Sequence, residues 1–253
     1  MRVTLIAGNW KMNKLRKEAV AFAQALPALL PPGHSSELLI CPPFTLLWEL
    51  QPLLAKAGVK MGAQDLFWED NGAYTGEISA SMLLDAGCTH VIIGHSERRQ
   101  VIGESDLLIN KKMHKACQEG LIPILCIGET LEERKAGKDE KVVAGQLKQA
   151  LAGLSSDRMD KLVIAYEPVW AIGTGVNASG QDAQNICAFI RGQLEEYYGS
   201  QLAAAVRILY GGSVKEENIK EFLQQADIDG ALIGGASLDA AVFANIVRLG
   251  GND

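Results

Sequence analysis

Eight short apolar runs, rich in β-branched residues, recur along the 253-residue chain. Within each run the residues are apolar nearly throughout and do not alternate with polar ones. That pattern is typical of parallel strands covered on both faces. We therefore expect strands at residues 3–9, 38–43, 59–64, 90–94, 122–128, 162–168, 206–212 and 230–235.

Longer segments with helical spacing lie between these runs. Apolar residues recur on one helix face before the fifth, seventh and eighth runs and at the end of the chain. These faces consist of Leu107, Leu108, Met113 and Ala116; Ile186, Phe189, Ile190 and Leu194; Ile219, Phe222 and Leu223; and Ala241, Phe243, Ile246 and Val247. Gly120 stands where a helix C-terminal cap is expected.

Alternating strands and helices predict right-handed strand–helix–strand units and a parallel sheet. Eight such units in about 250 residues have the size of a closed (β/α)8 barrel, the TIM barrel. An open, doubly wound sheet of eight strands is the alternative that the pattern leaves. The composition shows no break or linker, so we expect residues 1–253 to form one α/β catalytic domain.

Charge and cysteine content narrow the class of protein. The net charge is −6, with 24 basic and 30 acidic residues, which argues against a nucleic-acid partner. Five cysteines without a C-x-x-C motif indicate neither a disulfide framework nor a zinc site. No apolar stretch has the length of a signal peptide or a membrane span. We therefore expect a cytoplasmic protein without a membrane partner.

Polar residues and glycines follow the predicted strands, where the active sites of such folds lie. Glycine pairs follow the seventh and eighth runs, and glycine lets backbone N–H groups approach an oxyanion closely. A helix starting just beyond would add positive potential, so these loops are candidates for binding phosphate. Ordinary tight turns are the alternative. The pairs are Gly211-Gly212, before Ser213, and Gly234-Gly235.

His95 and Glu167 are the candidate proton-transfer groups. His95 precedes Ser96 and Glu97 at the expected start of a helix, whose dipole would lower the imidazole pKa. Glu167 ends an apolar run, so burial should raise its pKa. A base and an acid beside a phosphate site suit proton transfer on a small phosphorylated carbonyl compound. A core histidine and a capping or ion-paired glutamate are the structural alternatives.

Four blocks of sequence resemble the triosephosphate isomerase family. They are AGNWKMN (7–13), GHSERR (94–99), AYEPVWAIGTG (165–175) and YGGSV (210–214), in the family's order and spread over the whole chain. The resemblance implies interconversion of dihydroxyacetone phosphate and D-glyceraldehyde 3-phosphate, a step of glycolysis and gluconeogenesis. It implies a small phosphorylated triose as substrate and neither cofactor nor metal.

The resemblance also assigns roles to single residues. Glu167 is the base, His95 polarises the carbonyl and moves protons between oxygens, and Lys11 supplies positive charge. Asn9 orients the reacting groups, and Gly173, Ser213, Gly234 and Gly235 donate backbone N–H groups to the phosphate. Glu97, Ser96 and Cys126 are supporting residues, although Cys126 is more commonly a small core residue in such a position.

The resemblance further implies a closing lid and a homodimer. The lid spans residues 168–178, and its last hinge starts at Val176, where many members carry lysine. The dimer places residues 64–77 beside the partner's active site, and this loop contains Phe67, Trp68 and Tyr74. Aromatic residues in such a loop suit burial by a partner, whereas packing on their own subunit is the alternative.

Two other functions remain open at this point. A different barrel enzyme could act on phosphorylated metabolites; a Schiff-base aldolase would need a lysine inside the barrel, and after the first run the strands offer only Lys60. A non-catalytic phosphate-sugar binding protein would not need both Glu167 and His95. An assay with glyceraldehyde 3-phosphate separates the three.

Overall fold

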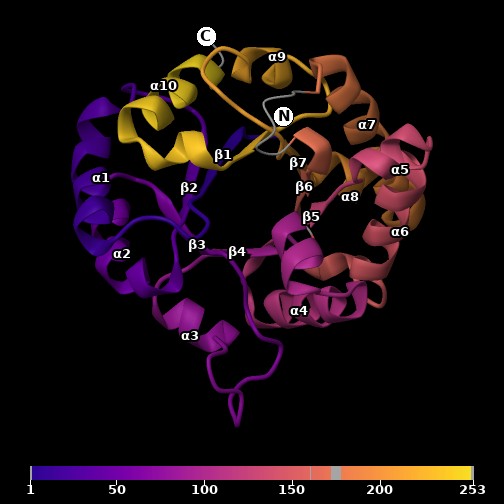
Figure 1. The fold of residues 1–253 in the computed structure, drawn as a ribbon, viewed down its shortest axis with the longest axis horizontal. Coiled ribbons are helices and arrows are strands. Elements are labelled where there is room, and N and C mark those ends of the chain that lie inside the picture. Colours follow the sequence, from indigo (N-terminus) through magenta and orange to yellow (C-terminus); the bar gives the residue numbers. More distant parts are fainter. Residues whose placement is uncertain (1, 160, 172–177, 252–253) are drawn as a thin grey trace.

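The eight predicted strands form one closed, parallel barrel (Figure 1). The structure is a computed structural model that describes residues 2–159, 161–171 and 178–251. Because β1 pairs with β2 on one side and with β8 on the other, the open sheet is excluded. The strands are β1 (Leu5–Asn9), β2 (Glu37–Cys41), β3 (Lys60–Ala63), β4 (His90–Ile93), β5 (Ile122–Ile127), β6 (Val163–Tyr166), β7 (Arg207–Tyr210) and β8 (Gly230–Ile233).

Helices surround the barrel (Figure 1). All four predicted helical faces lie on helices, namely α4, α7, α9 and α10. The helices are α1 (Arg16–Leu29), α2 (Leu47–Lys56), α3 (Ala80–Asp85), α4 (Asp106–Glu119), α5 (Leu131–Lys135), α6 (Asp139–Leu151), α7 (Gly180–Tyr198), α8 (Ser200–Ala205), α9 (Ile219–Leu223) and α10 (Ala240–Gly250). None of those in the described ranges is long and apolar enough to cross a membrane.

Local signals fix the helix ends. Ser105 accepts a hydrogen bond from the Leu108 backbone N–H and begins α4, and Ser179 does the same for Asp182 at the start of α7. Gly120 ends α4 with a φ of 82°, in the left-handed region that glycine enters without a steric penalty. Its predicted role as a C-terminal cap is confirmed.

The core has two parts because each strand buries both faces. Inward-facing residues such as Leu39, Ile92 and Leu209 fill the barrel, and outward-facing residues such as Ile40, Ile93 and Ile208 pack against the helices. The barrel interior is therefore solid, as expected for eight strands. Ligands can reach only its two ends.

The connection between β3 and α3 extends away from the rest of the molecule (Figure 1). Within it Phe67 stacks on Trp68, with ring centroids 4.0 Å apart, and packs against Tyr74 at 4.6 Å. The aromatic residues thus contact one another inside the loop, and Tyr74 remains exposed.

Gly128, directly after β5, allows the backbone that follows β6 to approach closely. A Cβ atom at this position would overlap the backbone carbonyl of Glu167. Backbone cannot move aside as a flexible side chain can, so only glycine fits there. Gly192, on the exposed side of α7, has no neighbouring atoms where its Cβ would lie.

These two glycines give a matched test of the strand approach. We expect Gly128→Ala to lower the free energy of unfolding by at least about 2 kcal/mol, because it overpacks the barrel. Gly192→Ala should raise it by about 0.5–1 kcal/mol, because alanine loses less entropy in a helix. Urea unfolding followed by circular dichroism measures both. Equal stability of Gly128→Ala and the parent protein would contradict the described approach of β5 to β6.

Candidate active site

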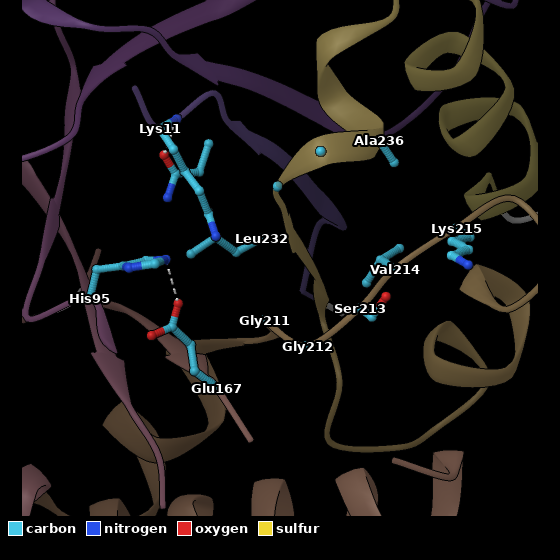
Figure 2. A pocket seen from close by; sticks show the side chains of 13 residues that line it. Lys11, His95, Glu167, Gly211, Gly212, Ser213, Val214, Lys215, Leu232 and Ala236 are labelled. Atoms are coloured by element: carbon cyan, nitrogen blue, oxygen red, sulfur yellow. Dashed lines mark hydrogen bonds and ion pairs between the residues drawn. The ribbon is translucent and has the colours of Figure 1, made fainter. Parts of the chain in front are cut away.

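A cavity of about 280 Å³ opens at the carboxyl ends of the strands (Figure 2). Seven of the predicted site residues line it, contributed by the end of β1 and by the segments that follow β1, β4, β6, β7 and β8. These residues are Asn9, Lys11, His95, Glu167, Ser213, Gly234 and Gly235. The closed barrel therefore collects in one place groups that are more than 200 residues apart in the sequence.

Glu167 and His95 face each other in this cavity (Figure 2). Glu167 follows β6 directly, and His95 follows β4 after one glycine. The His95 Nε2 atom lies 2.9 Å from the Glu167 Oε1 atom, and both side chains are buried. The Ser96 backbone N–H donates to the other carboxylate oxygen over 2.9 Å. A Cβ atom on Gly211 would lie only 2.9 Å from Glu167 Cγ, so glycine at this position leaves room for the glutamate side chain.

This contact reverses the pKa shifts expected from sequence. Burial alone would raise the Glu167 pKa, but His95 and the Ser96 N–H stabilise the carboxylate, and the pKa is lowered. Burial alone would lower the His95 pKa, but the carboxylates of Glu167 and Glu97 outweigh it, and the pKa is raised. Both expectations were wrong because a direct ionic contact, which sequence does not show, outweighs burial here.

The other nitrogen of His95 fixes where the ring carries its proton. Nδ1 lies 3.2 Å from the Glu97 backbone nitrogen, whose N–H donates to it. A nitrogen that accepts a hydrogen bond has no proton of its own. The neutral ring therefore carries its proton on Nε2, the atom that points into the cavity.

Lys11 reaches the cavity from a strained backbone. Its φ of 54° is unusual for a residue other than glycine. The Asn9 side chain accepts from the Lys11 N–H at 3.0 Å, and the Gln64 side-chain amide donates to the Lys11 carbonyl at 2.8 Å. The Lys11 ammonium pairs with Glu97 Oε1 at 2.7 Å. Sequence reasoning missed Gln64, since its role depends on β3 lying two strands from β1.

The glycine loops complete the cavity: Gly211 lies beside Glu167, whereas the loop after β8, with Ala236, lies across the cavity from it (Figure 2). A Cβ atom on Gly234 would lie 3.4 Å from Lys11 Cε, so the lysine side chain extends across to the loop after β8. A Cβ atom on Gly212 would overlap the Tyr210 ring. After β8 a short 3₁₀ helix (Gly235–Leu238) begins at the glycine pair, as expected, whereas after β7 the helix α9 starts only at Ile219.

Several sequence-predicted residues lie outside the cavity lining. Ser96 acts through its backbone, and Glu97 pairs with Lys11. Cys126 is fully buried on β5 and lines, with Ser96 and Glu167, a smaller cavity of about 190 Å³ behind the glutamate. Gly173 and Val176 lie outside the described residues. Lys215, which we did not single out, borders the cavity beyond Ser213 and Val214 (Figure 2).

The start of the predicted lid rests on Glu129, another residue that we did not assign. Glu129 is fully buried after β5, and its carboxylate accepts hydrogen bonds from Trp170 Nε1 at 2.8 Å and Tyr166 Oη at 3.1 Å. Its backbone carbonyl accepts from the Val169 N–H. These contacts fix residues 169–171 next to Glu167.

Comparison with known proteins agrees, over nearly the whole chain, with the family resemblance of the four sequence blocks. A family model described as triosephosphate isomerase matches residues 4–250. Proteins named triosephosphate isomerase from Moorella thermoacetica and Citrifermentans bemidjiense are 54% and 53% identical over 248 residues, covering 98% of this chain and 99% of theirs. One from Dictyoglomus turgidum is 51% identical over 98% of this chain and 100% of its own. The chain belongs to the triosephosphate isomerase family.

Proposed function

We propose that this isomerase interconverts dihydroxyacetone phosphate and D-glyceraldehyde 3-phosphate through an enediolate, without cofactor or metal, in glycolysis and gluconeogenesis. The observation that carries the proposal is the buried Glu167–His95 contact at 2.9 Å beside a glycine-lined cavity. A carboxylate and an imidazole in one small cavity can remove a proton from carbon and stabilise the adjacent oxygen.

Glu167 is the proposed base. Its lowered pKa keeps it ionised at neutral pH, so it is ready to accept a proton. A substrate carbon placed between Glu167 and His95 would separate the two side chains. The carboxylate would then lose its strongest stabilising partner, and its pKa would rise. It becomes a stronger base only where the substrate is bound.

His95 is the proposed electrophile. Its Nε2–H donates to Glu167 in this structure and can donate instead to a substrate oxygen that gains negative charge. The Glu97 N–H on Nδ1 remains in place when the Glu167 contact is lost. The ring is then held neutral, with a proton on Nε2 to pass between the two oxygens of the enediolate.

Lys11, Asn9 and the glycine loops are proposed to hold the substrate anion. The Lys11 ammonium lies beside Gly234, so one cation serves both the phosphate and the developing enediolate. Backbone N–H groups of Ser213, Gly234 and Gly235 are the proposed phosphate donors, with Gly173 added on the strength of the family resemblance. Glu97 supports Lys11 through an ion pair, and the Ser96 N–H supports the Glu167 carboxylate. Cys126 on β5 packs behind the glutamate.

The position of Lys60 makes a Schiff-base aldolase less suitable. Lys60 begins β3, at the amino end of the barrel, and is paired with Glu37 at 3.3 Å. The cavity at the carboxyl ends instead contains Lys11, which lies after a strand and is paired with Glu97. The isomerase mechanism uses both Glu167 and His95, whereas simple binding needs neither.

A homodimer is proposed from the surface beside the active site. A hollow of about 610 Å³ adjoins the cavity and shares Asn9, Lys11 and His95 with it. Exposed apolar side chains surround this hollow, with Met12 95%, Val101 79% and Ile102 64% exposed. The protruding loop at 64–77 of a second copy is the proposed occupant, since it offers an aromatic cluster of matching character. We further propose one catalytic domain over residues 1–253 and a cytoplasmic location.

Replacing the base tests the mechanism. In Glu167→Gln the side chain keeps its size, and its amide oxygen can still accept from the Ser96 N–H, so folding and binding of a phosphate-bearing inhibitor should persist. Because the amide cannot take up the proton, kcat should fall by at least about 10²-fold. Glu167→Asp should also be impaired, since it withdraws the carboxylate by about 1 Å. Glu140→Gln, on the exposed side of α6, is the control. Turnover of a folded Glu167→Gln protein within a fewfold of the parent would refute the mechanism.

The dimer proposal is tested by shortening residues 68–76 to a glycine turn. We expect a folded monomer with little activity, because the hollow beside Lys11 and His95 would lose its occupant. Met12→Lys should weaken the dimer as well, whereas Leu131→Lys, on exposed α5, should not. Sedimentation velocity gives the oligomeric state, and a dimeric loop variant would remove this loop from the interface.

A further inference from the structure

The barrel has a second polar cavity, at the end opposite the active site. Its volume is about 310 Å³, and Glu37, Lys60, Lys161 and Arg207 line it. Glu37, Lys60 and Arg207 each begin a strand. We call these four residues, together with His90, the barrel floor.

The floor belongs to the inner layers of the barrel. Glu37 precedes the inward-facing Leu39 by two residues, and Arg207 precedes Leu209 in the same way. Since side chains alternate along a strand, both floor residues face inward as well. The apolar interior, including Leu39, Ile92 and Leu209, separates the floor from the active site.

The floor has more positive than negative charge in a chain whose net charge is −6. Glu37 is the one carboxylate lining the described cavity. It contacts Arg207 at 3.2 Å and Lys60 at 3.3 Å. Within the described ranges no carboxylate lies at ion-pair distance from Lys161. Three cations therefore share one anion, and the cavity is suited to another.

The polar groups of the floor contact one another around Glu37. Glu37 Oε1 lies 3.3 Å from Lys60 Nζ and 3.4 Å from His90 Nε2, so the carboxylate is held by neighbouring groups on both sides. His90 is 0% exposed and uses Nδ1 to bond Thr89. Arg207 meets Glu37 through Nη1, which leaves the rest of its planar guanidinium for a ligand.

We propose that the barrel floor is a second anion site, which binds the phosphate group of inorganic phosphate or of a small phosphate ester. Arg207 offers the planar N–H fork that suits phosphate oxygens. Lys60 and Lys161 supply charge from the rim. The site is independent of the proposed catalytic function, because it shares no lining residue with the active site.

Phosphate titration of the ¹⁵N-labelled full chain tests this site. At constant ionic strength, the amide signals of Lys60, Leu162 and Arg207 should shift and saturate with inorganic phosphate, with a Kd different from that reported by Gly234 and Gly235. Glycerol phosphate in a parallel titration shows whether an ester also binds. Chloride should not saturate the floor signals. Failure of the floor signals to saturate with either phosphate compound, or an identical shift with chloride, overturns the proposal.

Charge variants separate the two sites. Lys161→Gln removes an exposed cation without breaking an ion pair of the described residues, and should raise the floor Kd about fivefold. Arg207→Gln should raise it more. In both, the Kd at Gly234 and the isomerase kcat/KM should stay within twofold of the parent. Lys141→Gln, on exposed α6, should change neither. An unchanged floor Kd in Lys161→Gln contradicts the proposed site.

Discussion

The contact between Glu167 and His95 is the interaction on which the active site depends. It joins the ends of β4 and β6, which lie on either side of β5 in the barrel. Gly128 after β5 permits the close approach of the Glu167 backbone, and Gly211 after β7 leaves space for its side chain. The barrel therefore places a buried carboxylate beside an imidazole at the mouth of the cavity.

The same contact gives the free protein a resting state that differs from its working state. Each side chain stabilises the charged form of the other, so the carboxylate is a weaker base and the imidazole a weaker acid than burial alone would make them. In the proposed mechanism a substrate that enters between them replaces this contact. Loss of the contact raises the Glu167 pKa, so the carboxylate becomes a stronger base only when substrate is bound. Proton transfer is thereby limited to the bound state.

Positive charge is arranged locally on an acidic protein. Asn9, Gln64 and Glu97 hold Lys11 at the active site. Asn9 and Gln64 bond its backbone, which lies in the left-handed region, and Glu97 pairs with its ammonium. Such strain costs about 1–3 kcal/mol and persists only where surrounding contacts impose it. At the other end of the barrel, Lys60, Lys161 and Arg207 surround Glu37. Both ends can attract anions that the net charge of −6 would repel.

Sequence predicted the architecture because each strand and helix has its own local pattern. The apolar runs, Gly120 and the polar residues after the strands required no knowledge of distant contacts. The pKa directions of Glu167 and His95 were wrong, and Gln64 and Glu129 were missed, because these depend on neighbours that only barrel closure brings together. Lys215 and the barrel floor were not recognised for the same reason. The resemblance supplied roles for Lys11 and Asn9 that periodicity alone could not.

The central claim is that substrate binding separates His95 from Glu167 and leaves the imidazole neutral. ¹⁵N NMR of the His95 ring measures this directly, in the free protein and with a bound phosphate-bearing enediolate analogue. In the free protein the ring should titrate above its ordinary pKa, because the Glu167 carboxylate favours the charged form. In the complex it should stay neutral through the neutral pH range, with its proton on Nε2 and none on Nδ1. A doubly protonated ring in the complex would contradict the account.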